Sequence, residues 1–260
     1  MTASPSPSSA LLRVEKLNKH FGGVHAVVDF DIVVRPGQIM GLIGPNGSGK
    51  TTVFNLINGI IPLDSGRVFF RDQDITRWPT HRIVQAGMGR TFQNIRLFRG
   101  LKVVDNVKAA LCHNADYGFG EALLRTPRVK QVEQQLTKMA EDLLTQVELL
   151  PLAQERPQNL PYGLQRRLEI ARALAVCPQL LMLDEPAAGL NPSEVTEIVQ
   201  LIRHLRDEMN IAVFLIEHHM DVVMPICDEI YVLNIGRTIA HGTPQEVQNH
   251  HEVLKAYLGE

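Results

Sequence analysis

The chain has 260 residues, of which 45% are hydrophobic, and its formal net charge is -2 at pH 7. This length suffices for one large α/β domain, alone or with a small appendage, and the near-neutral charge gives no electrostatic basis for binding nucleic acid. Three widely spaced cysteines indicate neither a metal site nor a disulfide framework, and they favour a reducing compartment. No apolar run approaches the roughly 20 residues that span a bilayer, so we expect any role at a membrane to go through a partner.

The N-terminal part begins with a polar tail and continues with β-like segments. Residues 1–10 are rich in Ser, Pro, Thr and Ala and lack basic residues, which predicts a disordered tail and not a signal peptide. Short β-like runs at 11–17, 24–34 and 66–70 surround Gly-rich turns and predict an antiparallel β subdomain. The apolar run at 39–43 predicts a buried strand.

A glycine-rich segment follows that strand and precedes a helical run at 53–58. Its sequence, GPNGSGKTT, fits the phosphate-binding loop pattern G-x-x-x-x-G-K-[ST], although a Gly-rich turn can also match by chance. Glycines let the backbone approach a phosphate, and the helix N-terminus offers N–H groups to an anion. Lys50 can reach the β- and γ-phosphates, and the Thr51 hydroxyl can ligate Mg²⁺. We therefore predict a nucleoside triphosphate site at Gly44, Pro45, Asn46, Gly47, Ser48, Gly49, Lys50, Thr51 and Thr52.

The rest of the chain is first helical and then alternates between strands and helices. Residues 103–147 are mostly helical, and residues 115–127 interrupt them as an inserted loop or short helix. An amphipathic stretch from 129 to 147 predicts a packing face made of Val132, Leu136, Met139, Leu143 and Val147. Strand–helix alternation at 179–235 predicts a mainly parallel sheet flanked by helices. The predicted fold class is α/β, a P-loop NTPase core with a mainly parallel sheet, an antiparallel β subdomain and a helical subdomain.

An apolar run at 180–186, LLMLDEP, ends in two carboxylates. A strand end that faces solvent can produce the same pattern. Together with the phosphate-binding loop, however, the two carboxylates predict a site of nucleotide hydrolysis. Asp184 would belong to the Mg²⁺ shell, and Glu185 would polarise a water molecule for in-line attack on the γ-phosphate.

Just upstream, residues 160–167 have the sequence LPYGLQRR and precede a helical run. At this point the chain resembles the ATP-binding subunits of ABC transporters, whose signature motif L-S-G-G-Q opens a helix shortly before such a strand. The resemblance implies a signature that completes the ATP site of a partner subunit, at Pro161, Tyr162, Gly163, Leu164 and Gln165. It also implies an ABC ATP-binding domain over 11–260, with a helical subdomain at about 94–178 and a C-terminal tail at about 236–260.

The same resemblance implies further site residues. Gln93 matches the Q-loop glutamine that contacts the metal and the attacking water, although an ordinary loop amide is the alternative. Residues 187–192 match the D-loop. His218 matches the switch histidine at the γ-phosphate, with the neighbouring His219 as the alternative. Phe21 stands where the family stacks an aromatic ring on adenine, or it is a core residue.

Two signature positions depart from the family pattern. Pro161 replaces a serine that donates to the partner's γ-phosphate, and proline has neither a hydroxyl nor a backbone N–H. Leu164 stands where glutamine is usual, while Gly163 is kept. These changes predict two unequal composite ATP sites and favour a heterodimer over a homodimer. We interpret the neighbouring Arg166 and Arg167 as a solvated or partner-facing helix edge.

Several segments resemble the branch of ABC ATP-binding subunits that serves branched-chain (hydrophobic) amino acid uptake, namely 90–93, 118–127, 187–192, 215–218 and 257–260. Lipopolysaccharide-export and urea or amide systems are the alternatives within the family. A stand-alone P-loop kinase or GTPase and a soluble ABC protein acting on DNA or ribosomes are the alternatives in other classes.

The resemblance implies a set of ligands and partners. These are ATP, Mg²⁺, a homologous ATP-binding subunit, two integral-membrane permeases and, indirectly, a solute-binding protein. The chain would then lie on the cytoplasmic face of the inner membrane, held there by the permeases. The apolar residues after Gln93 are predicted either to line the permease groove or to belong to the core, and they are Ile95, Leu97, Phe98 and Leu101.

Overall fold

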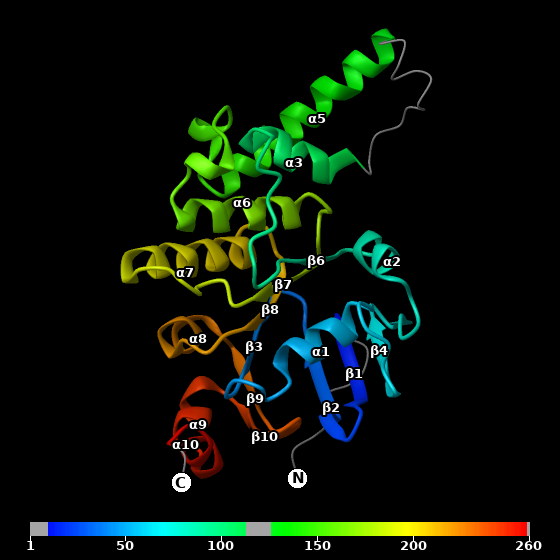
Figure 1. Cartoon of the computed structure of the whole chain (residues 1–260), viewed down its shortest axis with the longest axis vertical. Helices are drawn as coiled ribbons and strands as arrows, with labels where there is room; N and C mark the ends of the chain where they lie inside the picture. Colours follow the sequence, from blue (N-terminus) through cyan, green and yellow to red (C-terminus); the bar gives the residue numbers. More distant parts are fainter. Residues whose placement is uncertain (1–9, 113–125, 259–260) are drawn as a thin grey trace.

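The computed structural model describes residues 10–112 and 126–258. The predicted tail at 1–10, apart from Ala10, and most of the predicted insertion at 115–127 lie outside the described residues. The described chain forms an elongated body, with helices at one end and, toward the other end, β-sheets with the short C-terminal helices beside them (Figure 1). Among these residues, no helix is both long and apolar enough to cross a membrane.

An antiparallel sheet lies beside the phosphate-binding loop, as the sequence predicts. Its strand order is β2-β1-β4-β5, and Leu12 pairs with Val34 on one side and with Phe70 on the other. Along the first half of β1, buried side chains alternate with more exposed ones because successive side chains of a strand point to opposite faces. The strands are β1 (Leu12–Phe21), β2 (Val24–Val34), β4 (Ser65–Phe70) and β5 (Gln73–Asp74).

A second sheet is mainly parallel and has the strand order β10-β9-β3-β8-β7-β6 among the described residues. Only the edge strand β10 runs antiparallel to its neighbour β9. Every residue of β3, β7 and β8 is buried, as expected for parallel strands covered on both faces. The strands are β3 (Ile39–Ile43), β6 (Met88–Arg90), β7 (Leu180–Asp184), β8 (Ala212–Ile216), β9 (Glu229–Asn234) and β10 (Arg237–Gly242).

Helices cover both faces of this sheet and build the distal end of the molecule. In Figure 1, α3 and α5 lie beyond α6, which packs against both of them. The helices are α1 (Lys50–Ile57), α2 (Thr80–Gln85), α3 (Val103–Leu111), α5 (Pro127–Gln146), α6 (Tyr162–Leu174), α7 (Pro192–Asp207), α8 (Met220–Ile226), α9 (Pro244–Gln248) and α10 (His251–Leu258), with 3₁₀ turns at Leu150–Leu152 and Pro157–Asn159.

The buried stripe of α5 differs in part from the predicted one. Leu136 and Val147 are buried as predicted, but Met139 is 38% exposed. Ala140 and Leu144 take the buried positions one residue further along the helix. The stripe shifts because the partners on α3 and α6 set which face of α5 is covered.

The parallel sheet separates two apolar cores. Ile39 and Ile43 belong to the core shared with the helices of the distal end, whereas Met40 and Leu42 belong to the core shared with α1 and the antiparallel sheet. This alternation follows from the two-residue period of a strand. The carboxyl ends of β3, β7 and β8 meet at one edge of the sheet, where ligands bind in open α/β sheets.

Candidate nucleotide site

The loop between β3 and α1 has the geometry of a phosphate cradle. Gly44 has a φ of 151°, and a Cβ added there would lie 2.0 Å from the Leu233 carbonyl oxygen. Gly49 has a φ of 106°, and its added Cβ would lie 2.3 Å from the Ala26 carbonyl oxygen. Both positions therefore require glycine. The helix begins at Lys50, three residues before the predicted run at 53–58, so its N-terminus closes directly onto the loop.

The Lys50 ammonium group lies inside this loop. Its Nζ donates to the carbonyl oxygens of Gly44 at 2.7 Å and of Pro45 at 3.0 Å. Burial lowers the pKa of Lys50, while the carboxylates of Glu185 and Asp184 oppose that shift. An ammonium group has three donors, so a phosphate entering the loop would find this charge already in place.

A cavity of about 250 Å³ joins the loop to residues that are distant in the sequence. Gln93 Nε2 donates to Glu185 Oε2 at 2.9 Å, and His218 Nδ1 lies 3.8 Å from Glu185 Oε1. Glu185 has a φ of 49°, a conformation that is sparse for residues other than glycine and that recurs at active sites. The cavity is lined by Asn46, Gly47, Ser48, Gly49, Lys50, Thr51, Thr52, Gln93 and Glu185.

Asp184 has the chemistry of a cation ligand. It is 1% exposed, and its Oδ2 accepts a hydrogen bond from Arg90 Nη2 at 3.1 Å. Its Oδ1 is buried and has no hydrogen-bond partner among the described residues. Burial raises the pKa of the Asp184 carboxyl, and Arg90 opposes that shift. A buried carboxylate oxygen without a partner fits a hard cation, which prefers oxygen ligands.

The interpretation of Arg166 and Arg167 as a solvated or partner-facing edge is wrong. Arg166 is 0% exposed, and its guanidinium donates to the carbonyl oxygens of Phe92 at 3.0 Å and Gln93 at 3.2 Å. It also pairs with Glu169 at 2.8 Å, and Glu169 accepts from the Phe92 N–H at 3.1 Å. Arg167 is 6% exposed and bonds to two glutamates, Glu148 and Glu197.

Arg166 thus uses its two terminal nitrogens inside the protein, while its buried Nε has no hydrogen-bond partner among the described residues. Arg167 pairs with two glutamates whose side chains are exposed. The Arg166–Glu169 pair holds the main chain of the Gln93 segment against α6, the helix that starts at the signature. The three-residue spacing of Arg166 and Glu169 on a helix was the signal in the sequence, because such residues are neighbours on one helix face.

The signature residues lie at the start of α6. Pro161 is the N-cap and provides no side-chain cap. An added Cβ at Gly163 would lie 2.9 Å from the Glu194 Oε1 atom of α7, so this glycine allows a close approach. Leu164 packs against the distal core, and the Gln165 side chain donates to the Leu160 carbonyl oxygen at 2.9 Å. Tyr162 is 43% exposed, and its hydroxyl accepts a hydrogen bond from Arg166 Nη2 at 3.3 Å.

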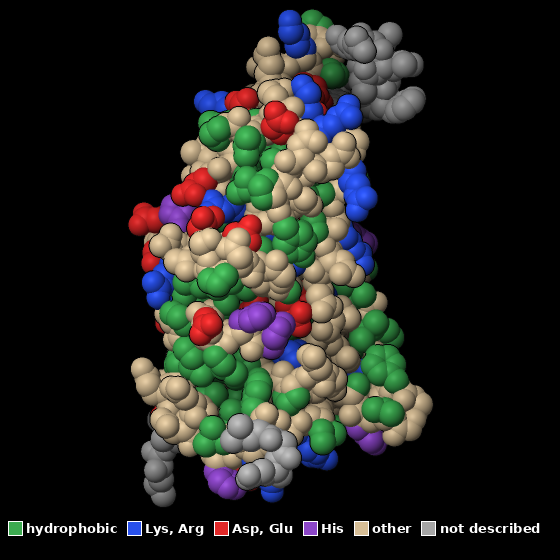
Figure 2. All heavy atoms as spheres, turned by 60° about the vertical axis from the view of Figure 1, so that its left-hand side comes forward, with side chains coloured by type: hydrophobic (Ala, Val, Ile, Leu, Met, Phe, Trp, Pro, Cys, Tyr) green, Lys and Arg blue, Asp and Glu red, His purple; other side chains and the backbone are tan. Residues whose placement is uncertain are grey.

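Exposure decides between the alternatives for Phe21 but not between the two adjacent histidines, which are both exposed. Phe21 is 50% exposed, which excludes the core interpretation, but it is not among the residues that line the cavity at the loop. The rings of His218 and His219 have centroids 4.2 Å apart, and the His218 side chain is 41% exposed. Figure 2 shows a face on which histidine and acidic side chains adjoin at mid-height.

Comparison with known proteins defines the class. The ABC transporter family model matches residues 27–188, and the chain therefore belongs to the ABC transporter ATP-binding family, whose members hydrolyse ATP. The solved structure of a nucleotide-free ATP-binding cassette from an ABC transporter is 30% identical with a TM-score of 0.83, covering 96% of this chain and 100% of that one. A cassette in its ADP conformation gives a TM-score of 0.82 at 30% identity, covering 96% and 99%.

The comparison also identifies a branch of this family. A second family model, for branched-chain amino acid ATP-binding cassette transporters, matches residues 237–260. The high-affinity branched-chain amino acid transport ATP-binding protein LivG of Escherichia coli is 44% identical over 97% of this chain and 99% of its own length. BraF of Pseudomonas aeruginosa, of the same description, is 42% identical over the same shares. The lipopolysaccharide export ATP-binding protein LptB of Escherichia coli is 36% identical over 96% and 98%.

Proposed function

We propose that this chain is the ATP-hydrolysing subunit of an ABC importer for branched-chain amino acids, acting at the cytoplasmic face of the membrane. The convergence of Lys50, Gln93, Glu185 and His218 at one edge of the parallel sheet carries the hydrolytic part of the proposal. The similarity to LivG and BraF, together with the C-terminal match, supports the solute class.

The proposed chemistry is mainly positioning and electrostatic stabilisation. Lys50 and the loop N–H groups bind the phosphates. Thr51, Asp184 and Gln93 would hold Mg²⁺, which neutralises charge on the phosphates when bound. Glu185 orients the attacking water and accepts its proton, and the Gln93 amide fixes the direction of the Glu185 carboxylate through their hydrogen bond.

The roles of two exposed residues complete the proposed nucleotide site. His218 contacts the γ-phosphate from the end of β8. Phe21, at the end of β1, stacks its exposed ring on adenine. Both side chains are accessible in the described structure, which such contacts require.

We further propose that the site is completed by the signature of a homologous subunit. The N-terminus of α6 has no side-chain cap, so the N–H groups of Tyr162, Gly163 and Leu164 can face a partner's phosphate. The Gln165 amide on α6 donates to the Leu160 carbonyl oxygen just before the helix, so this donor is already engaged. Pro161 removes a hydroxyl from this surface, which favours a heterodimer in which the two composite sites differ, with a homodimer as the alternative.

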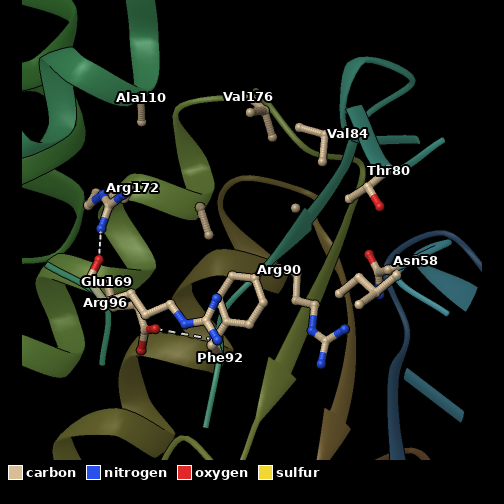
Figure 3. Close-up of a pocket in the computed structure, with 13 residues that line it drawn as sticks. Asn58, Thr80, Val84, Arg90, Phe92, Arg96, Ala110, Glu169, Arg172 and Val176 are labelled. Atoms are coloured by element: carbon tan, nitrogen blue, oxygen red, sulfur yellow. Dashed lines mark hydrogen bonds between the residues drawn. The ribbon is translucent and has the colours of Figure 1, made fainter. Parts of the chain in front are cut away.

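We propose that the permeases dock at a groove between the sheet and the distal helices. A cavity of about 270 Å³ lies there, and Figure 3 shows Arg90, Phe92, Arg96, Glu169 and Arg172 around it. The residues predicted to line it, Ile95, Leu97, Phe98 and Leu101, are not among its described lining.

Two of the residues predicted either to line the permease groove or to belong to the core differ in their surroundings. Leu97 packs against the core, whereas Phe98 is 50% exposed and lies under the Arg172 guanidinium at 4.7 Å. Phe92 and Glu169 line the groove and are hydrogen-bonded to each other next to Gln93. A permease segment bound in the groove would therefore displace the main chain that carries Gln93. A solute-binding protein would act only through the permeases.

Uptake of labelled leucine, isoleucine and valine tests the function in cells that lack this chain. We expect uptake to fall on deletion, to return with the wild-type chain, and to stay low with Glu185→Gln. Normal uptake on deletion, with impaired urea or amide uptake or impaired lipopolysaccharide export instead, would overturn the solute class. Absence of ATP hydrolysis by the wild-type chain assembled with its permeases would overturn the motor function.

A further inference from the structure

Glu217 is a fully buried carboxylate that the proposed chemistry does not use. It directly follows β8, and it is 0% exposed. Its Oε1 accepts a hydrogen bond from the Ala187 N–H at 2.9 Å. Its Oε2 accepts from the N–H groups of His218 at 3.0 Å and His219 at 3.2 Å. One side chain thus bonds to two loops that leave neighbouring strands.

These two loops carry the proposed catalytic groups. Ala187 lies two residues after Glu185 and begins the D-loop segment, 187–192, and the other loop carries His218. The sheet ladder adds one bond at this edge, from the Glu185 N–H to the Ile216 carbonyl oxygen at 3.0 Å. Beyond it, Glu217 supplies the connection between the loops, and the 3.8 Å separation of His218 and Glu185 depends on both loops keeping their places.

A metal site is the other role that this cluster suggests. Ligand atoms of Glu217, His218 and His219 lie within 4.8 Å of one another. However, both oxygens of Glu217 already accept backbone N–H groups, and a cation bound there would repel those donors. The observed bonding therefore favours a connecting role for the carboxylate.

We propose that Glu217 is a positioning residue that ties the D-loop segment to the switch histidine, so that a displacement of one loop moves the other. This rests on the proposed roles of Glu185 and His218. Because the D-loop segment also faces the signature side of the molecule, where Gly189 approaches the Tyr162 ring, the carboxylate links events at the subunit surface to the hydrolytic groups.

The amide variant Glu217→Gln gives the sharpest test. Glutamine keeps the size of the side chain but has a single acceptor oxygen, and its NH₂ group would face an N–H donor. Either Ala187 or the two histidine N–H groups must then lose their acceptor. We expect kcat to fall at least tenfold while the affinity for ATP and the KM stay within twofold, since Lys50 and the loop are untouched.

Glu217→Asp keeps both acceptor oxygens on a shorter stem, and we expect it to recover part of the lost kcat. The exposed Glu252→Gln is the matched control and should behave as wild type. Amide hydrogen exchange provides a second readout: in Glu217→Gln, Ala187, His218 and His219 should exchange faster, while the amides of β3 keep their protection. A wild-type kcat, or unchanged protection at all three amides, would overturn the proposal.

Three further outcomes decide between positioning and general structural support. If Glu217→Gln loses ATP affinity and β3 protection together with kcat, the residue only supports the fold and the proposal is overturned. In a His218→Ala background, Glu217→Gln should lower kcat by a smaller factor than it does in the wild-type chain. Fully additive effects of the two substitutions on kcat would refute the coupling between Glu217 and His218. If Glu185→Gln and His218→Ala both hydrolyse ATP at the wild-type rate, the proposed catalytic roles fail, whatever Glu217→Gln does.

Discussion

Replacing Arg166 with methionine should have two effects, a loss of thermal stability and a loss of activity through the displacement of Gln93. The change removes a guanidinium that is 0% exposed and leaves Glu169, which is 5% exposed, without its charged partner. Breaking a buried ion pair on one side costs about 3–5 kcal/mol. For a domain of this size, each kcal/mol lowers Tm by about 2–4 °C, so we expect a fall of roughly 6–20 °C.

Arg166→Met should also lower ATP hydrolysis, because Arg166 donates two hydrogen bonds to the main chain of Phe92 and Gln93. The carbonyl oxygens of Phe92 and Gln93 both lose their Arg166 donor, and a misplaced Gln93 should lower kcat by roughly ten- to a hundredfold. The double variant Arg166→Met/Glu169→Met replaces the pair by apolar groups and should regain most of the stability. It should not regain kcat, because the two carbonyl oxygens still lack a donor.

Thermal unfolding and steady-state ATP hydrolysis measure the two effects separately, with the exposed Arg237→Met as the control. A loss of less than 1 kcal/mol in Arg166→Met, on the order of an exposed ion pair, would refute the burial argument. Recovery of kcat together with stability in the double variant would refute the link to Gln93.

The stability of Arg166→Met should also depend on pH. Burial raises the pKa of the Glu169 carboxyl, and Arg166 opposes that shift. Without Arg166, the pKa of Glu169 in the folded state lies further above its pKa in the unfolded state. The contribution of Glu169 to stability is then fully present below the unfolded-state pKa and is lost as pH rises through the folded-state pKa. The deficit relative to wild type should therefore shrink as the pH is lowered from about 8 to about 5. A deficit that does not change with pH would contradict this account.

Three further changes test the nucleotide site. Glu185→Gln should retain ATP binding and trap an ATP-bound dimer, detectable by size-exclusion chromatography, and full-rate hydrolysis would exclude Glu185 as the base. Lys50→Ala should lose ATP affinity in a calorimetric titration because its Nζ lies inside the loop, and unchanged affinity would contradict the assigned use of the loop. Pro161→Ser should raise transport-coupled ATP hydrolysis by restoring a donor to the partner's site, and an unchanged rate would remove the main support for unequal sites.

The local sequence by itself determined the phosphate-binding loop and the elements on either side of it. The positive φ angles at Gly44 and Gly49 are a local feature of the loop, and the apolar runs at 39–43 and 180–184 by themselves predict buried strands. The antiparallel sheet followed in the same way from short alternating runs between Gly-rich turns. Such features depend on residues that are close together in the chain, so they can be predicted from the amino-acid sequence alone.

Only the tertiary structure decided where the charged side chains of the site point. The sequence predicts Arg166 at a surface, yet Arg166 is buried because the Gln93 segment, distant in sequence, packs over α6 and supplies carbonyl oxygens for its donors. In the sequence, Glu217 is only an acidic residue at a strand end. Its donors His218 and His219 are its neighbours in the chain, but the Ala187 N–H reaches it only because β7 and β8 lie side by side. A buried charge is stable only where folding assembles its partners, and these partners come from separate segments of the chain.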